Sequence, residues 1–293
     1  MTKHRIRGVK SLRRKSPAEK ILYCFVSLVF AIVAASYIYI LVWTLISALK
    51  THTEIVMDPF SLPEVWNWSH FIEMAEVFQV NGHGFFEMLF NSVWFSVGGA
   101  FLQHIVTISF AYVSTKYEYP GSKWVYTIVL IMMTLPVYGS AGAQYRLIRS
   151  LGLVDSYAHI FISAAGFTSA YLYYRAFFQN LSWSYAEAGM MDGANDFQIY
   201  FKVMFPQAKP IFTALFLTTW LTSWNTYEST LVYLPNLPTL PVGVYQFNRA
   251  MMFEARLDIL FAACLVVSIP ALIIFIAFNK VLTTNVSLGG IKG

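Results

Sequence analysis

Two acidic side chains, Glu187 and Asp192, lie on a short polar segment, residues 184–210, between hydrophobic runs long enough to span a bilayer. Residues 184–192 include no lysine or arginine. A helix that rests on lipid headgroups usually carries basic residues on its polar face, and an anionic leaflet repels acids. These acids therefore predict polar contact with a protein in the water phase.

The same segment contains the residues needed to fold as a helical elbow. Ser184 and Glu187 have the spacing of a capping box, which predicts that a two-turn helix begins there. Gly193 allows a sharp change of direction that a residue with a β-carbon resists. A second helix is expected from Asp196, and Pro206 is expected to end it.

Several kinds of chemistry are absent from the sequence. Cys24 and Cys264 lie inside apolar runs, and no Cys/His cluster has the spacing of a metal site. No GxxxxGK loop is present, so we expect neither nucleotide hydrolysis nor a catalytic residue, cofactor or metal in this chain. The net charge of +5 is explained by basic residues beside the membrane rather than by nucleic acid.

The composition predicts an all-α membrane protein. Hydrophobic residues make up 57% and charged residues 12%, about half the charged fraction of a soluble domain. Six runs are expected to be transmembrane helices, at about residues 21–48, 85–114, 123–145, 157–178, 209–233 and 258–281. The first run is too long for the apolar part of a signal peptide, so we expect it to be a retained helix.

The positions of the basic residues predict the orientation. Placing the N-terminal tail in the cytoplasm puts 15 of the 20 lysine and arginine residues on that side. The five that remain outside are Lys50, Arg146, Arg149, Arg249 and Arg256. Five acids in the loop between residues 50 and 86 agree with this sidedness. Both termini and the elbow are therefore predicted to be cytoplasmic.

The spacing within the elbow resembles the "EAA" coupling loop of bacterial ABC-importer permeases. That motif has a glycine six residues after its glutamate and an apolar-x-apolar-proline group about ten residues later. The residues expected to contact the ATPase subunit are Glu187, Ala188, Gly189, Asp192, Gly193, Ala194, Phe205 and Pro206. Gly189 departs from the family, which usually has alanine there; we expect this to weaken the helix slightly without affecting docking.

Further segments extend the resemblance over residues 85–293, in order. Residues 135–136, 151–153, 223–225, 239–243 and 288–293 are similar to the maltose-permease-type, carbohydrate-transporting members of the family. The resemblance implies the six-span permease fold of type I ABC importers. It divides the chain into a basic tail (1–20), a first helix with an external loop (21–84), a core (85–283) with its coupling loop (182–210), and a C-terminal tail (284–293).

The resemblance also implies partners and a mechanism. The chain would pair with a second homologous permease as a heterodimer, beneath which two ATP-binding subunits use ATP and Mg. An extracytoplasmic solute-binding protein would deliver a carbohydrate. Glu187 would be the charged contact to the ATPase subunit and Gly193 the bend, in a complex of the bacterial cytoplasmic membrane.

The substrate path is expected near the end of the fifth run, at Trp224, Asn225, Tyr227 and Glu228. Aromatic rings pack on sugar faces and amides bond to hydroxyls. Alternatively, the two aromatic residues belong to an interfacial belt and Glu228 lies in water. His104, with its neighbour Gln103, is expected to hydrogen-bond between helices rather than to bind a ligand.

Two other classes of function stay open from the residues alone. An ion-coupled secondary transporter would need acids near the membrane midplane or internal repeats, and the sequence has neither. A membrane scaffold that binds a soluble partner through the elbow would not need the polar and aromatic residues of the fifth run. An ABC importer of a non-sugar solute is a third alternative.

Overall fold

The computed structural model describes residues 16–134, 140–164, 169–254 and 256–285. Over these residues the chain is helical and contains no strand, as the composition predicts. The elements in chain order are α1 (Pro17–Ala48), α2 (His52–Met57), α3 (Ser69–Val77), α4 (Phe85–Val93), η2 (Trp94–Gly98), α5 (Gly99–Lys116), α6 (Ser122–Thr134), α7 (Ala141–Ser150), η3 (Tyr157–His159), α8 (Ile160–Ser163), α9 (Ser169–Asn180), α10 (Ser184–Met191), α11 (Asp196–Gln198), η4 (Ile199–Met204), α12 (Phe205–Asn225), α13 (Glu228–Tyr233), α14 (Leu240–Glu254) and α15 (Leu257–Asn285).

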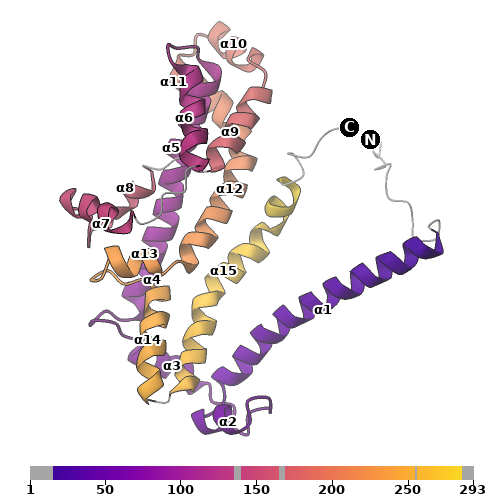
Figure 1. Ribbon diagram of the computed structural model, residues 1–293, viewed down its shortest axis with the longest axis vertical. Helices are drawn as coiled ribbons and strands as arrows, with labels where there is room; N and C mark the ends of the chain where they lie inside the picture. The colour runs from indigo at the N-terminus through magenta and orange to yellow at the C-terminus, as the bar shows by residue number, and fades with distance from the viewer. Residues whose placement is uncertain (1–15, 135–139, 165–168, 255, 286–293) are drawn as a thin grey trace.

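Three of the six expected spans are helices long and apolar enough to cross a membrane. They are Pro17–Ala48, Phe85–Lys116 and Leu257–Phe278. The first of these, α1, leans away from the other helices over most of its length (Figure 1), and only Ser47 and Ala48 at its end are buried. Its apolar surface is therefore free for lipid or for another subunit.

The third, fourth and fifth expected spans are each divided between shorter helices. The described part of the third is α6 followed by α7, and that of the fourth is α8 followed by α9. The fifth ends at Asn225, because Thr226 adopts an extended conformation before α13 begins. The side chains of Asn225 and Thr226 each donate a hydrogen bond to a backbone carbonyl one turn earlier. Such bonds compete with the backbone hydrogen bonds that would continue the helix.

Two hydrophobic clusters lie at opposite ends of the molecule. The elbow cluster joins α5, α9, α10, η4 and α12 through residues such as Tyr174, Ala186 and Met204. The distal cluster joins α3, α4, α14, α15 and the end of α12 through residues such as Phe78 and Trp224. In Figure 1, α10 and α11 mark the first end and α2 and α3 the second.

His104 connects three helices between these clusters. It is fully buried on α5, its Nδ1 lies 2.8 Å from the hydroxyl of Tyr174 on α9, and its Nε2 lies 2.8 Å from the hydroxyl of Thr219 on α12. Both ring nitrogens are therefore used by neighbouring helices. The expectation that His104 is an interhelical hydrogen-bonding group is confirmed.

The loop between α1 and α4 folds against the start of α15. Arg256 forms ion pairs of 2.8 Å with Glu73 of α3 and 3.1 Å with Asp258 of α15. The hydrogen bonds that Arg256 donates to the carboxylates of Asp258 and then Glu73 raise the pKa of its guanidinium. Asp258, which is buried, also lies 3.6 Å from His70. These contacts tie the distal loop to the last helix.

The helix α14 was not among the elements predicted from the sequence. This helix approaches α3 and α4 at Gly243, where a β-carbon would lie 2.8 Å from Phe78 Cζ and 2.9 Å from Met88 Sδ. Only glycine fits at this crossing without displacement of its neighbours. The segment was missed because its helix depends on this packing rather than on a hydrophobic run.

Candidate functional site

The elbow consists of α10, a sharp turn and α11. The amide of Gly193 donates to the carbonyl of Met190, and the amide of Ala194 donates to that of Gly189, both at 3.0 Å. Gly193 has φ +77°, a conformation that a side chain disfavours. The prediction that Gly193 forms the bend is confirmed.

The predicted capping box of the first elbow helix is wrong. The amide of Ser184 donates to the hydroxyl of Ser182 at 3.3 Å, and the two serine hydroxyls lie 2.8 Å apart. The N-cap residue of the helix is Trp183, whose side chain makes no capping hydrogen bond. Glu187 therefore takes no part in a capping box. A capping box does form at the second helix, between Asn195 and Gln198. The serines bond to each other because they are only two residues apart.

The elbow has a buried face and an exposed face. Ala186 is buried, and a β-carbon on Gly189 would lie 3.3 Å from Ile199 Cγ1, so α10 and η4 are closely packed. Gly189 therefore has a packing role that the family comparison of residue types did not suggest. Ala194 is half-buried on the same side of the turn.

The exposed face mixes acids with large apolar side chains. Glu187, Ala188 and Asp192 are exposed, as is Met191, whose exposed fraction is 88%. Two aromatic residues just beyond the turn, Phe197 and Phe201, are 78% and 59% exposed. We call the exposed residues Glu187, Ala188, Met190, Met191, Asp192, Phe197 and Phe201 the elbow face. Several large apolar side chains exposed within one short segment are typical of a protein-binding surface.

Phe205 and Pro206 lie below the elbow face rather than in it. Both are half-buried, and the ring of Phe205 packs on Tyr200 and Phe212. The expectation that Pro206 ends the helix is wrong, because η4 continues directly into α12. Pro206 falls in the first turn after a π-helical segment, where the hydrogen-bonding pattern changes register and the missing N–H of proline is tolerated.

Two consecutive residues at the end of α5 hold both sides of the elbow. Lys116 Nζ donates to the carbonyl oxygen of Leu181, which precedes α10, at 2.5 Å. The hydroxyl of Tyr117 donates to the carboxylate of Asp196, which begins α11, at 3.1 Å. We call Lys116 and Tyr117 the elbow clamp. This pair could not be predicted from local sequence, since its partners are 65 and 79 residues away.

The four residues expected on the substrate path do not converge. Trp224 is buried and donates from Nε1 to the carbonyl of Val267 at 3.2 Å. Asn225 and Tyr227 border a separate groove of about 480 Å³, where the Tyr227 ring stacks on Tyr245 with centroids 4.7 Å apart. Glu228 is exposed at the start of α13 and borders neither this groove nor the cavity described next.

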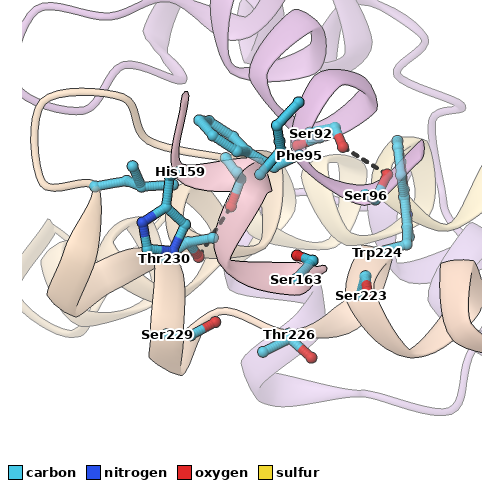
Figure 2. Close-up of a pocket in the computed structure, with 13 residues that line it drawn as sticks. Ser92, Phe95, Ser96, His159, Ser163, Ser223, Trp224, Thr226, Ser229 and Thr230 are labelled. Carbon is cyan, nitrogen blue, oxygen red and sulfur yellow. Dashed lines mark hydrogen bonds between the residues drawn. The ribbon is translucent and has the colours of Figure 1, made fainter. Parts of the chain in front are cut away.

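A cavity of about 150 Å³ lies where η2, α8 and α13 meet the end of α12. Figure 2 shows Ser92, Phe95 and Ser96 on one side of it and Thr226 and Ser229 on the opposite side. Of the thirteen described residues that line it, eight are serine or threonine. The sequence signal that could have pointed to it is the run of hydroxyl and aromatic residues at 222–230.

Among the residues that the structure describes, no group of three His, Cys, Asp or Glu side chains is placed to hold a metal ion. Some segments named in the sequence predictions lie outside the described part of the chain. They are residues 1–15 of the basic tail, residues 135–136 and residues 288–293 of the C-terminal pattern.

Known proteins resemble the chain over nearly its whole length. The permease protein NgcG of a diacetylchitobiose uptake system in Streptomyces coelicolor is 26% identical, over 85% of this chain and 82% of its own. The arabinooligosaccharides transport system permease protein AraQ of Bacillus subtilis is 25% identical, over 96% of this chain and 99% of its own.

A solved structure has the same fold. One chain of a bacterial ABC transporter involved in the import of alginate, an acidic polysaccharide, matches with a TM-score of 0.77. It is 23% identical and covers 91% of this chain and 98% of its own. Residues 105–287 match the family described as the binding-protein-dependent transport system inner membrane component. The chain therefore belongs to this family of membrane transport proteins.

Proposed function

We propose that the chain is the permease subunit of an ATP-driven importer that takes up a carbohydrate delivered by a binding protein. The elbow face carries the proposal, because it offers a partner acids and exposed apolar side chains on a support fixed by the elbow clamp. The names of the relatives, an uptake system for diacetylchitobiose and a transport system for arabinooligosaccharides, favour a sugar over other solutes.

The partners in this proposal are a second homologous permease, two ATP-binding subunits that use ATP and Mg, and an extracytoplasmic solute-binding protein. The excess of lysine and arginine on one side supports a cytoplasmic location for both termini and the elbow in a bacterium. This chain itself carries out no hydrolysis. When the ATP-binding subunits move, this chain moves with them, so that the transport path opens first to one side of the membrane and then to the other.

The helices that leave the elbow supply the mechanical connection. α5 ends at the elbow clamp and begins at η2, which borders the hydroxyl-lined cavity. α12 starts from η4 and ends at Asn225, and its residues Ser223 and Trp224 line the same cavity. With 21 residues, α12 is roughly 30 Å long. Displacement of the elbow would thus reach the cavity through two continuous helices.

Reconstituted transport tests the proposal. The complete complex in liposomes should take up labelled oligosaccharides only when ATP and the binding protein are both present. Glu187→Arg should abolish binding of the ATP-binding subunits, whereas Glu118→Arg, a charge reversal at an exposed acid outside the elbow face, should not. Uptake of amino acids but no sugar would refute the carbohydrate assignment. Normal ATP-driven uptake by Glu187→Arg would refute the docking role.

A further inference from the structure

We propose that the cavity between η2, α8, α13 and the end of α12 binds one uncharged sugar ring of the transported solute. The inference rests on the proposed function and goes beyond it, because it names a binding site and excludes charged sugars from it. The residues that carry it come from four separate parts of the chain, as Figure 2 shows.

The size of the cavity limits its ligand to a single ring. Its volume of about 150 Å³ lies below the roughly 300–1,000 Å³ of pockets that enclose whole drug-sized ligands. A cavity of similar size in another protein holds benzene, a six-membered ring. An oligosaccharide would therefore place one ring here and leave the rest of its length outside.

The hydroxyl groups of the cavity are divided into fixed and free ones. Ser96 donates to the carbonyl of Ser92 at 2.6 Å, and the hydroxyl of Ser92 accepts from the amide of Leu240 at 2.7 Å. Thr230 is 3.3 Å from Thr239 and also donates to a backbone carbonyl. These fixed hydroxyls keep lone pairs that can accept from a ligand.

The free hydroxyls are those of Ser163, Ser223 and Ser229. No hydroxyl of these three serines bonds to any other part of the chain that the structure describes, so each can both donate and accept. A sugar hydroxyl has the same dual capacity. A surface that combines fixed acceptors with free donor–acceptor groups is therefore complementary to a polyol.

Two kinds of ring complete the lining. Phe95 and Trp224 offer apolar surface of the kind that packs against the C–H face of a sugar. His159 Nδ1 lies 3.1 Å from the carbonyl of Leu153, which can only accept, so Nδ1 carries the proton. In the neutral ring Nε2 is then an acceptor for a further hydroxyl.

The absence of charge sets the specificity. Among the described residues that line the cavity, none is aspartate, glutamate, lysine or arginine. A carboxylate placed there would lose its hydration without gaining a cationic partner, which is costly in a part-buried site. The site should therefore accept a neutral ring and reject the corresponding uronate.

The backbone brings one wall unusually close to the others. A β-carbon on Gly99 would lie 3.0 Å from the hydroxyl oxygen of Ser163, so the glycine allows α8 to approach α5. The π-helical turn η2, which directly precedes Gly99, forms the neighbouring wall, and single π-helical turns are often found at functional sites. Both features place polar groups at one point rather than along a helix face.

Thiol labelling of the complete importer complex tests the site directly. The two native cysteines are first removed by Cys24→Ser and Cys264→Ala, and Ser223→Cys then supplies a single thiol in the cavity. The rate at which a small charged thiosulfonate labels this thiol is measured without sugar and with an excess of glucose, galactose, arabinose or glucuronate. We expect at least one neutral sugar to slow labelling severalfold and glucuronate to have no effect. Ser150→Cys, an exposed site on α7 outside the cavity, should be unaffected by any sugar.

Transport kinetics supply the second test. Ser223→Ala and Ser229→Ala should each raise the KM of sugar uptake roughly three- to tenfold, the value of one hydrogen bond, with kcat retained. Ser150→Ala should change neither constant. Protection by glucuronate equal to that by glucose, the lack of any protection, or an unchanged KM would each overturn the site. A complex that transports sugar yet shows no protection keeps the proposed function, whereas one that transports no sugar loses both.

Discussion

Lys116 Nζ donates a hydrogen bond of 2.5 Å to the carbonyl oxygen of Leu181, and this bond fixes the end of α5 to the start of the elbow. Leu181 directly follows α9, whose last carbonyls have no partner within the helix. A lysine ammonium there also interacts favourably with the negative end of the helix dipole. The elbow is therefore anchored to α5 as well as to α9, the helix that directly precedes it in the chain.

Removal of this anchor should weaken the coupling of ATP hydrolysis to transport. Lys116→Met keeps the length of the side chain but loses a charge-assisted bond, which contributes about 1.5–3 kcal/mol where it is shielded from water. We expect assembly to persist while the amount of solute transported per ATP falls severalfold. The ratio is measured in proteoliposomes by parallel uptake and phosphate-release assays.

Lys209→Met is the matched control, because Lys209 is exposed on α12 and holds no part of the elbow. It should leave the ratio of transport to hydrolysis unchanged. If Lys116→Met also left this ratio unchanged, the elbow clamp would have no part in coupling.

The turn of the elbow should be more sensitive to substitution than its helix. Gly193→Ala puts a β-carbon on a residue with φ +77°, which costs about 1–2 kcal/mol. Gly189→Ala adds a methyl 3.3 Å from Ile199 Cγ1 but gains about 1 kcal/mol of helix propensity. We expect thermal unfolding in detergent to show a clear decrease for Gly193→Ala and a much smaller change for Gly189→Ala. Equal decreases in the unfolding temperature of the two variants would mean that the positive φ of Gly193 does not limit the stability of the elbow.

The elbow illustrates what local sequence could predict. The bend at Gly193 was predictable because a positive φ depends on one residue and its neighbours. The cap at Ser184 was not, because Ser182 competes for the same amide and the spacing rule does not consider it. The continuation through Pro206 depends on a π-helical turn, which no hydrophobic period reveals.

The cavity shows why the site residues were harder to predict than the fold. Its wall residues Ser92, Ser163 and Ser223 are separated by about sixty or more positions, and no motif connects them. Hydrophobic runs predicted six spans, yet three of the expected spans are divided between shorter helices in the described part of the chain. The fifth is divided where Thr226 becomes extended and its hydroxyl donates to the carbonyl of Thr222. Composition is enough to predict a membrane protein. A binding site, by contrast, depends on which distant segments of the chain come together in the fold.

The histidine between the helices should show energetic coupling to its partner. His104→Leu leaves the fully buried hydroxyl of Tyr174 without its hydrogen bond, at a cost of about 1–3 kcal/mol. Tyr174→Phe removes that hydroxyl, so the double variant should lose less stability than the sum of the single variants. The difference, about 0.5–3 kcal/mol, is measured from denaturant unfolding in micelles. Strict additivity would contradict a direct bond between the two side chains.

The loop at the distal end should lose order when Glu54 is protonated. Its carboxylate accepts from the amide of Glu64 at 2.9 Å and from the amide and hydroxyl of Thr51 at 2.7 and 2.8 Å. These hydrogen bonds, that of Glu64 first, lower the pKa of Glu54 below its ordinary value of 4.5. A lowered pKa in the folded state means that the stabilisation is complete above the unfolded-state pKa and is lost as pH falls through the folded-state value.

Hydrogen–deuterium exchange of the segment 50–65, corrected for the intrinsic effect of pH, measures this loss. Protection should be constant near neutral pH and should decline only below about pH 4.5. Glu54→Gln should show reduced protection already at neutral pH and little further decline as the pH falls. The glutamine amide is uncharged and has one acceptor oxygen, so it cannot replace the carboxylate in all three hydrogen bonds. Glu76→Gln, an exposed acid on α3, serves as the control and should behave as the unmodified protein. A decline of the same size in Glu54→Gln would assign the acid sensitivity of this loop to another group.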